Sequence, residues 1–118
     1  MKIKIMSILI AAMTGCATTN EVVELQASLL ERFGVPYLQL TLINKNTYPI
    51  QYQLEWIVFD KQLNTLGSGY TFFDPILGNR QQTMDSYFLN GSSFKATDVC
   101  MLQVTAPVSM TINFQENC

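Results

Sequence analysis

The sequence contains no histidine among its 118 residues, and only 14% of its residues are charged. Without histidine, the chain lacks the base that activates the nucleophile in most serine and cysteine hydrolases, and it lacks the commonest metal ligand. Gly67-Ser68-Gly69 therefore has no histidine base, and the strand–turn–helix context of a nucleophile loop is also missing. Asp74 and Asp85 could pair as carboxylates or hold calcium weakly, but their spacing matches no calcium-binding loop. We expect a protein that is not an enzyme and that uses no metal or cofactor.

Basic residues are also few, with seven Lys and Arg against nine Asp and Glu and a net charge of −2 at neutral pH. Nucleic-acid-binding surfaces need clustered Lys and Arg side chains, because the phosphate backbone dominates binding. The basic residues of this chain form no such cluster. We therefore expect no nucleic acid among its partners.

The chain lacks an apolar run long enough to cross a bilayer as a helix, which takes about 20 residues. The apolar stretch at 5–13 is shorter than this, and it follows Lys2 and Lys4. A short positive region followed by a short apolar region is typical of a secretory signal peptide.

The apolar stretch ends in Met13-Thr14-Gly15-Cys16, which resembles the lipobox of bacterial lipoproteins. The resemblance implies that residues 1–15 are removed and that the Cys16 sulfur carries a diacylglyceryl group. In Gram-negative lipoproteins Ala17 after the cysteine, rather than aspartate, implies export to the outer membrane, with the domain facing the periplasm. Each buried CH2 of an acyl chain contributes about 0.8 kcal/mol, so several chains would anchor the protein firmly in the bilayer. The alternative is an ordinary cleaved signal peptide with an incidental cysteine.

Removing 15 of the 118 residues leaves 103, which is enough for one domain with a modest core. Lys2 and Lys4 leave with the signal, so five basic and nine acidic residues remain and the net charge becomes −4. Residues 16–20 are then the lipidated cysteine and a short polar tether. The domain at 21–118 is expected to lie close to the membrane.

Two cysteines remain besides Cys16, and an even pair in an oxidising compartment favours a disulfide. We expect a Cys100–Cys118 bond, which would contribute about 3 kcal/mol in the chain-entropy model. Two free thiols are the alternative. A zinc site is not expected, since two cysteines without histidine do not complete the four ligands of zinc.

The stretch from Ile50 to Asp60 has the period of two that is typical of a half-buried strand, with the one tryptophan at its centre. Segment 37–43 alternates in the same way, and turn-forming residues at 44–49 join the two. We expect these strands to form a hairpin in the middle of a small sheet. The residues on the buried face of the second strand are Ile50, Tyr52, Leu54, Trp56 and Val58.

Further strands are expected at 66–73, 82–89, 99–104 and 109–114. Gly67 and Gly69 suggest a bulge or a close approach of the backbone to another group. Residues 21–33 fit a strand or a helical stripe, and the β character of the remaining chain favours the strand. The pattern predicts an all-β fold, a small antiparallel β-sandwich of six to seven strands, for which an immunoglobulin-like arrangement is one option.

A leucine–x–asparagine segment, in Leu40-Thr41-Leu42-Ile43-Asn44, and a turn with Pro49-Ile50 precede the central strand. The strand then carries Tyr52 and Trp56 four positions apart and ends in Asp60. This order is similar to the core signature of the YcfL-like family, small proteobacterial outer-membrane lipoproteins of uncharacterised function. The similarity covers residues 37–60, and the glycine that usually follows the aspartate is missing. The resemblance implies the fold and the lipid anchor and transfers no catalytic residue.

One apolar stretch is a candidate partner surface, because it is densely apolar and leads into a loop. Its candidate contact residues are Tyr70, Phe72, Phe73, Ile76 and Leu77. Core packing is favoured for Phe72 or Phe73.

These observations favour an outer-membrane-anchored lipoprotein whose domain is a non-catalytic interaction or assembly module of the cell envelope. Its expected partners are the bilayer, through acylated Cys16, and an envelope protein such as a component of a secretion machine. The alternative is a lipoprotein that binds a small molecule, a glycan or a peptidoglycan fragment, with Trp56 and tyrosines lining a cleft. An envelope hydrolase is a third option, and no acid–base pair supports it.

Overall fold

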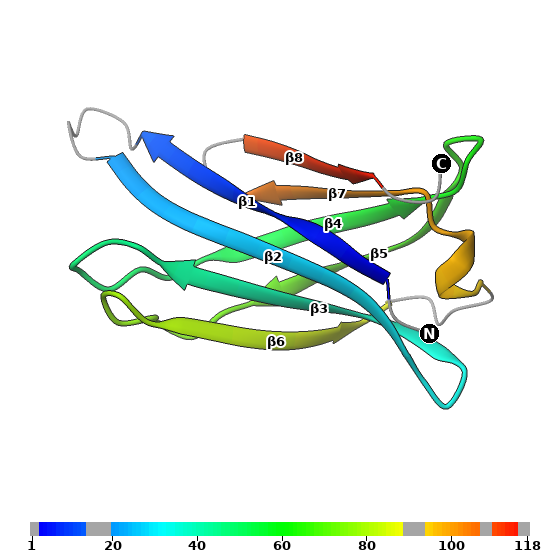
Figure 1. The fold of residues 1–118 in the computed structure, drawn as a ribbon, viewed down its shortest axis with the longest axis horizontal. Coiled ribbons are helices and arrows are strands. Elements are labelled where there is room, and N and C mark those ends of the chain that lie inside the picture. The colour runs from blue at the N-terminus through cyan, green and yellow to red at the C-terminus, as the bar shows by residue number, and fades with distance from the viewer. Residues whose placement is uncertain (1–2, 14–19, 89–93, 107–109, 116–118) are drawn as a thin grey trace.

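The computed structural model describes residues 3–13, 20–88, 94–106 and 110–115. They form two four-stranded antiparallel sheets that pack face to face (Figure 1). The first sheet has the order β1-β2-β3-β6 and the second the order β5-β4-β7-β8. The strands are β1 (Ile3–Met13), β2 (Asn20–Arg32), β3 (Val35–Asn44), β4 (Gln53–Phe59), β5 (Thr65–Phe72), β6 (Gln81–Tyr87), β7 (Met101–Ala106) and β8 (Met110–Gln115), with a 3-10 turn η1 (Ala96–Asp98) before β7.

The predicted all-β sandwich is confirmed. Seven strands lie in the described part of the chain from Asn20 onward, at the upper end of the expected number. Among the described residues, no helix is long and apolar enough to span a bilayer.

The segment predicted to be a signal peptide forms β1 in the full chain, where it pairs antiparallel with β2 along nearly its whole length. Figure 1 shows β1 at the edge of its sheet. Cleavage of residues 1–15 stays a prediction, since a processing signal is read by an enzyme before the chain folds. If cleavage occurs, the first sheet of the mature domain has three strands.

The ambiguous segment at 21–33 is a strand, as the β character of the chain favoured. In β2, Val23, Leu25, Ala27 and Leu29 are buried, and the residues between them are on the outer face. A helix would bury positions three and four apart, which this alternation does not provide.

The predicted hairpin of segments 37–43 and 50–60 is wrong, because the two strands lie in different sheets. β3 pairs with β2 and β6, whereas β4 pairs with β5 and β7. The connection at 45–52 crosses from one sheet to the other instead of turning back. A period of two shows which face of a strand is buried, but it does not say which strand supplies the hydrogen bonds.

Two buried asparagines hold this crossing. The Asn44 Nδ2 atom donates to the carbonyls of Tyr48, at 2.8 Å, and Ile76, at 2.9 Å. The Asn44 Oδ1 atom accepts from the Asn46 backbone N–H at 2.8 Å. Asn46 in turn exchanges two side-chain hydrogen bonds with the backbone of Val22, at the start of β2. The network therefore ties the crossing to β2 and to the β5–β6 connection.

Trp56 lies at the centre of the core, fully buried between the sheets. Its Nε1–H donates to Thr71 Oγ1 at 2.9 Å, and its ring meets Phe88 edge-on with centroids 5.0 Å apart. The expectation of a bulge or close approach at the two glycines is confirmed. A Cβ added at Gly69 would lie 2.6 Å from the Trp56 ring, and one added at Gly67 would lie 2.8 Å from Phe88. The β4–β5 register also shifts beside Gly67.

Candidate interaction surfaces

The structure divides the predicted partner surface into an exposed and a buried part. Tyr70, Phe72 and Leu77 are exposed, whereas Phe73 and Ile76 are 2% and 3% exposed and belong to the core. Residues on successive positions of a strand point to opposite faces, so Phe72 and Phe73 cannot both be outside. The expectation that one of the two phenylalanines is core is met by Phe73. Phe73 and Ile76 are thus unavailable to a partner.

Tyr70 and Phe72 form an aromatic pair on the outer face of β5, an edge strand of its sheet. Their rings stack with centroids 6.5 Å apart and an interplanar angle of 30°. On the neighbouring strand, Glu55 lies opposite Tyr70 and Gln53 lies opposite Phe72. Two exposed aromatic rings beside polar groups are typical of protein contact surfaces.

Leu77 lies elsewhere, in the β5–β6 connection at the end of the sandwich where β2 begins. It lines a cavity of about 320 Å³ together with Pro75, Arg80 and Gln82. The same connection is tied to the crossing, because Asn79 N–H donates to the Asn46 carbonyl at 3.0 Å. Leu77 therefore lies at the end of the sandwich where β2 begins, beside a cavity that Tyr70 and Phe72 do not line.

Two exposed apolar residues at the opposite end were not predicted. Phe33, in the β2–β3 turn, is 99% exposed with φ of 53°, and Leu63, in the β4–β5 turn, is 66% exposed with φ of 64°. Phe33 and Gly34 both have positive φ, the pattern of a type I′ hairpin turn, which usually takes Asn and Gly. The sequence signal for this exposed tip is Phe33 directly before Gly34, at the turn position that usually takes asparagine.

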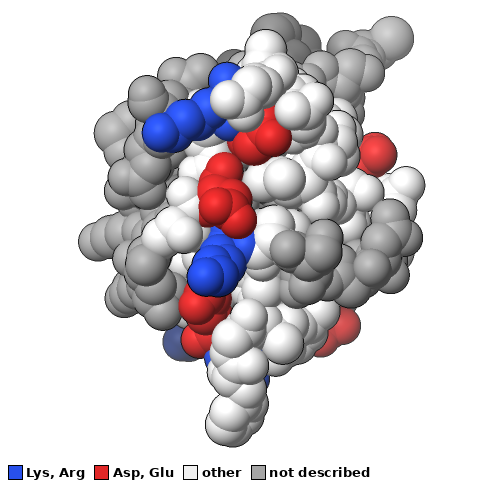
Figure 2. All heavy atoms as spheres, turned by 90° about the vertical axis from the view of Figure 1, so that its right-hand side faces the viewer, with Lys and Arg blue, Asp and Glu red and all other residues white. Residues whose placement is uncertain are grey.

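The β2–β3 tip projects from the sandwich, and Figure 2 looks onto this end. Acidic and basic side chains are interspersed down the visible face, and the uncharged hairpin tip projects below them. The face therefore has no large field of one sign, which would be needed to attract a strongly charged partner.

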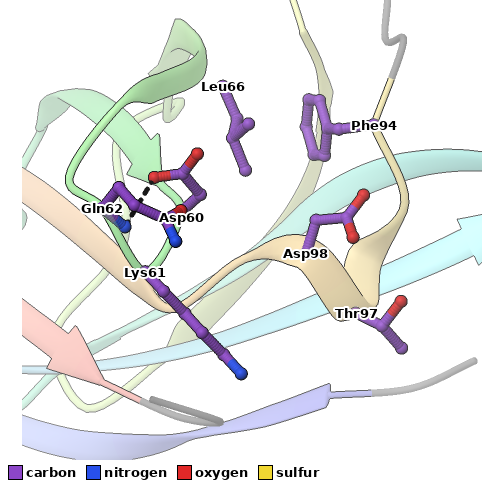
Figure 3. Close-up of a pocket in the computed structure, with 7 residues that line it drawn as sticks. All are labelled: Asp60, Lys61, Gln62, Leu66, Phe94, Thr97 and Asp98. Carbon is purple, nitrogen blue, oxygen red and sulfur yellow. Dashed lines mark hydrogen bonds between the residues drawn. The ribbon is translucent and has the colours of Figure 1, made fainter.

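A polar pocket of about 540 Å³ lies at the same end, between the β4–β5 turn and η1. Figure 3 shows the Asp60 and Asp98 carboxylates on opposite walls of this pocket. Asp60 accepts hydrogen bonds from the backbone amides of Gln62 and Asn64, both at 2.9 Å, and Asp98 accepts from the Lys95 amide at 2.9 Å. Both carboxylates therefore cap local turns.

The electrostatics of Asp60 agree with this capping role. The Asn64 backbone N–H is the main cause that holds the pKa of Asp60 below its usual value. Desolvation opposes it, and the Asn64 side chain and the Gln62 amide add smaller lowering effects. A catalytic acid would need its pKa raised, not lowered. Among the residues that the structure describes, no three His, Cys, Asp or Glu side chains lie close enough to hold a metal ion.

One arginine is well held on the outer face of the first sheet. The Arg32 guanidinium lies 4.8 Å from the centre of the Tyr37 ring and donates to the Tyr87 hydroxyl at 3.2 Å. The Asp85 carboxylate forms an ion pair with the Arg32 guanidinium, with an N–O distance of 3.9 Å. Tyr87 and then Tyr37 raise the pKa of Arg32 above its usual value. The cluster couples β2, β3 and β6 below the hairpin tip.

The structure describes only one of the three cysteines that the sequence assigned to lipidation and to a disulfide. Cys16 and Cys118 lie outside the described residues, while Cys100 is buried just before β7. Met101 pairs with Gln115 in the β7–β8 ladder, so Cys118 follows the partner of Met101 by three positions. The Cys100–Cys118 bond and the acylation of Cys16 stay predictions.

No protein-family model and no curated protein sequence matches the chain. The sandwich is similar to a solved DUF1425 structure. That crystal structure, of a DUF1425 family member from Shewanella sp. pv-4, gives a TM-score of 0.59 over 86% of this chain and 90% of that chain. The two sequences are 14% identical, so the likeness concerns the fold alone.

Proposed function

We propose that this protein is a lipoprotein of the Gram-negative outer membrane, facing the periplasm, whose β-sandwich is a non-catalytic interaction or assembly module. Membership of the YcfL-like family is part of this proposal, supported by the residues at 37–60. The observation that carries it is the combination of the lipobox-like Met13-Thr14-Gly15-Cys16 with exposed aromatic residues on the sandwich.

The arrangement of the two ends supports a tethered module. β2 begins four positions after Cys16, at one end of a domain whose longest dimension is 43 Å. The β2–β3 tip with Phe33 lies at the other end (Figure 1). Acyl chains on Cys16 would confine the domain to the membrane surface and raise its effective concentration against envelope partners. Such a partner could be a component of a secretion machine or of another envelope complex.

A small-molecule or glycan-binding lipoprotein is supported less well. The aromatic residue expected to line a cleft between the sheets, Trp56, is fully buried against Phe88 and Gly69. The two cavities described above lie at the ends of the sandwich and are lined mainly by turn residues.

The test is affinity purification of the tagged protein from gently solubilised envelopes. Cys16→Ala, which cannot be acylated, is the control for tethering, and Tyr70→Ser with Phe72→Ser is the control for the aromatic surface. A defined envelope protein that is recovered with the wild type and lost with either control supports the proposal. The same proteins recovered from all three samples, or none from any, would contradict it.

A further inference from the structure

The backbone N–H and C=O groups of β2 point alternately toward its two neighbouring strands, β3 and β1. Val22 accepts a backbone hydrogen bond from Lys45 on the β3 side, so even-numbered residues of β2 direct their backbone groups toward β3. In an antiparallel ladder the hydrogen-bonded pairs alternate between the two neighbours. The N–H and C=O groups of odd-numbered residues, including Leu25 and Ala27, therefore point toward β1.

The same odd-numbered residues supply the core. Val23, Leu25, Ala27 and Leu29 are at most 1% exposed in the full chain, with β1 in place beside them. β1 also lies over β8 of the other sheet and closes this flank of the sandwich. Loss of β1 would thus leave a row of β2 backbone groups unpaired, and it would also uncover a strip of apolar side chains.

The opposite flank of the sandwich, where β5 and β6 meet, is closed without β1. There the Thr71 hydroxyl of β5 and the Ser86 hydroxyl of β6 share a hydrogen bond of 2.6 Å across the two sheets. Thr71 also accepts from the buried Trp56 indole. Processing after residue 15 would therefore leave a sandwich that is closed on one side and one strand short on the other.

We propose that the β2 edge of the processed chain is a docking groove for an extended segment of another envelope polypeptide. The segment runs antiparallel to β2 and carries large aliphatic residues at alternate positions. This inference rests on the part of the proposed function that removes residues 1–15. It names the surface and the kind of partner that the tethered module would bind, by strand addition.

The chain's own N-terminal segment defines the chemistry of the occupant. Ile10 and Ile8 lie opposite Val23 and Leu25, and Ile5 and Ile3, beyond an irregularity in β1 between Ile5 and Ile8, lie opposite Ala27 and Leu29. Residues directly opposite one another in an antiparallel pair share one face of the sheet. A partner residue at any of these four positions would thus face the core between the sheets, where an aliphatic side chain replaces the lost apolar contact.

An unpaired apolar edge is also hazardous, because it favours aggregation with any other exposed strand. The described part of β2 shows none of the usual protection on its inner face, which has no proline, lysine or other charged residue between Val23 and Leu29. An edge of this kind is consistent with a partner that occupies it for most of the protein's lifetime.

The experiment uses wild-type protein, expressed as the full chain and purified from envelopes in mild detergent. Mass spectrometry first establishes whether residues 1–15 are absent and whether Cys16 is acylated. The probe is a fluorescent peptide with the sequence of residues 3–13 and a lysine tail for solubility, and its binding is followed by anisotropy.

Two N-methylated peptides make the test specific for strand pairing. Methyl groups on the Ile8 and Ile10 nitrogens block the hydrogen bonds to Leu25 and Val23, whereas methyl groups on Leu9 and Ala11 face away from β2. Two lost hydrogen bonds of about 1 kcal/mol each predict binding weakened about 30-fold for the first peptide. The second should keep the affinity of the parent. Binding should also slow hydrogen exchange at the Leu25 and Ala27 amides.

Each outcome decides between the inference and the proposed function. If the purified protein still contains residues 3–13, the edge is permanently filled, and the docking groove is overturned. If residues 1–15 are absent but Cys16 is not acylated, the membrane anchor fails while the peptide result still decides the groove. If Cys16 is acylated and the parent peptide does not bind, or both methylated peptides bind equally, the groove is overturned and the tethered lipoprotein stands.

Discussion

Asn44→Ala should strongly destabilise the domain, because the Asn44 side chain ties the crossing between the sheets to the β5–β6 connection. The substitution removes three donor contacts, to the carbonyls of Tyr48, Ile76 and Leu77, and two acceptor contacts with Asn46. Asn44 itself is fully buried, so water does not replace these bonds without a structural change.

The size of the effect follows from which groups lose their last partner. The Ile76 carbonyl also accepts from Ile50 N–H at 3.0 Å, and the Leu77 carbonyl from Arg80 N–H at 3.1 Å, so both stay satisfied. Among the described residues, the Tyr48 carbonyl and the Asn46 backbone amide have no other hydrogen-bond partner. An orphaned buried group costs about 1–3 kcal/mol. The partly exposed Tyr48 carbonyl falls at the low end, so we expect a loss of about 3 kcal/mol in total.

Urea unfolding followed by Trp56 fluorescence measures this loss, since the tryptophan is single and fully buried. The Cys16→Ala background avoids detergent. With a slope of about 1.5 kcal/mol per molar urea, the midpoint should fall by about 2 M. Asn64→Ala is the matched control, because among the described residues the Asn64 side-chain amide donates only to the exposed Asp60 carboxylate, at 3.2 Å. The reasoning is refuted if both substitutions lower stability by the same small amount.

Three further changes test other parts of the structure. Gly69→Ala should cost about 2 kcal/mol in urea unfolding, because its Cβ would overlap the Trp56 ring at 2.6 Å, and an unchanged midpoint would contradict the close approach. Because the pKa of Asp60 is lowered on folding, its ionised form stabilises the fold above the unfolded-state value of 3.8, and this contribution disappears as the pH falls through the folded-state pKa. Asp60→Asn should therefore be less stable than the wild type at neutral pH and equal to it at strongly acidic pH, and a difference that does not depend on pH would rule this out. Cys100→Ser and Cys118→Ser should each lose about 3 kcal/mol, and the double variant no more than either alone, whereas additive losses would exclude a shared disulfide.

The sequence by itself determined the elements and their buried faces. Alternation placed Leu54, Trp56 and Val58 on the core side of β4, and the β character of the remaining chain favoured a strand for β2. The two glycines signalled a close approach, which Trp56 and Phe88 explain. These features are local, since a period of two and the lack of a Cβ act within one strand and its nearest contact.

Only the tertiary structure decided which strands pair and which apolar residues stay outside. β3 and β4 are consecutive and similar in pattern, yet they lie in different sheets, with the buried Asn44 network at the crossing between them. Phe73 became core and Phe33 became fully exposed, although both are phenylalanines at strand ends. The N-terminal segment likewise closes the β2 edge only through pairing with a strand further along the chain. Hydrogen bonding and burial of this kind depend on partners distant in sequence, which a local pattern does not specify.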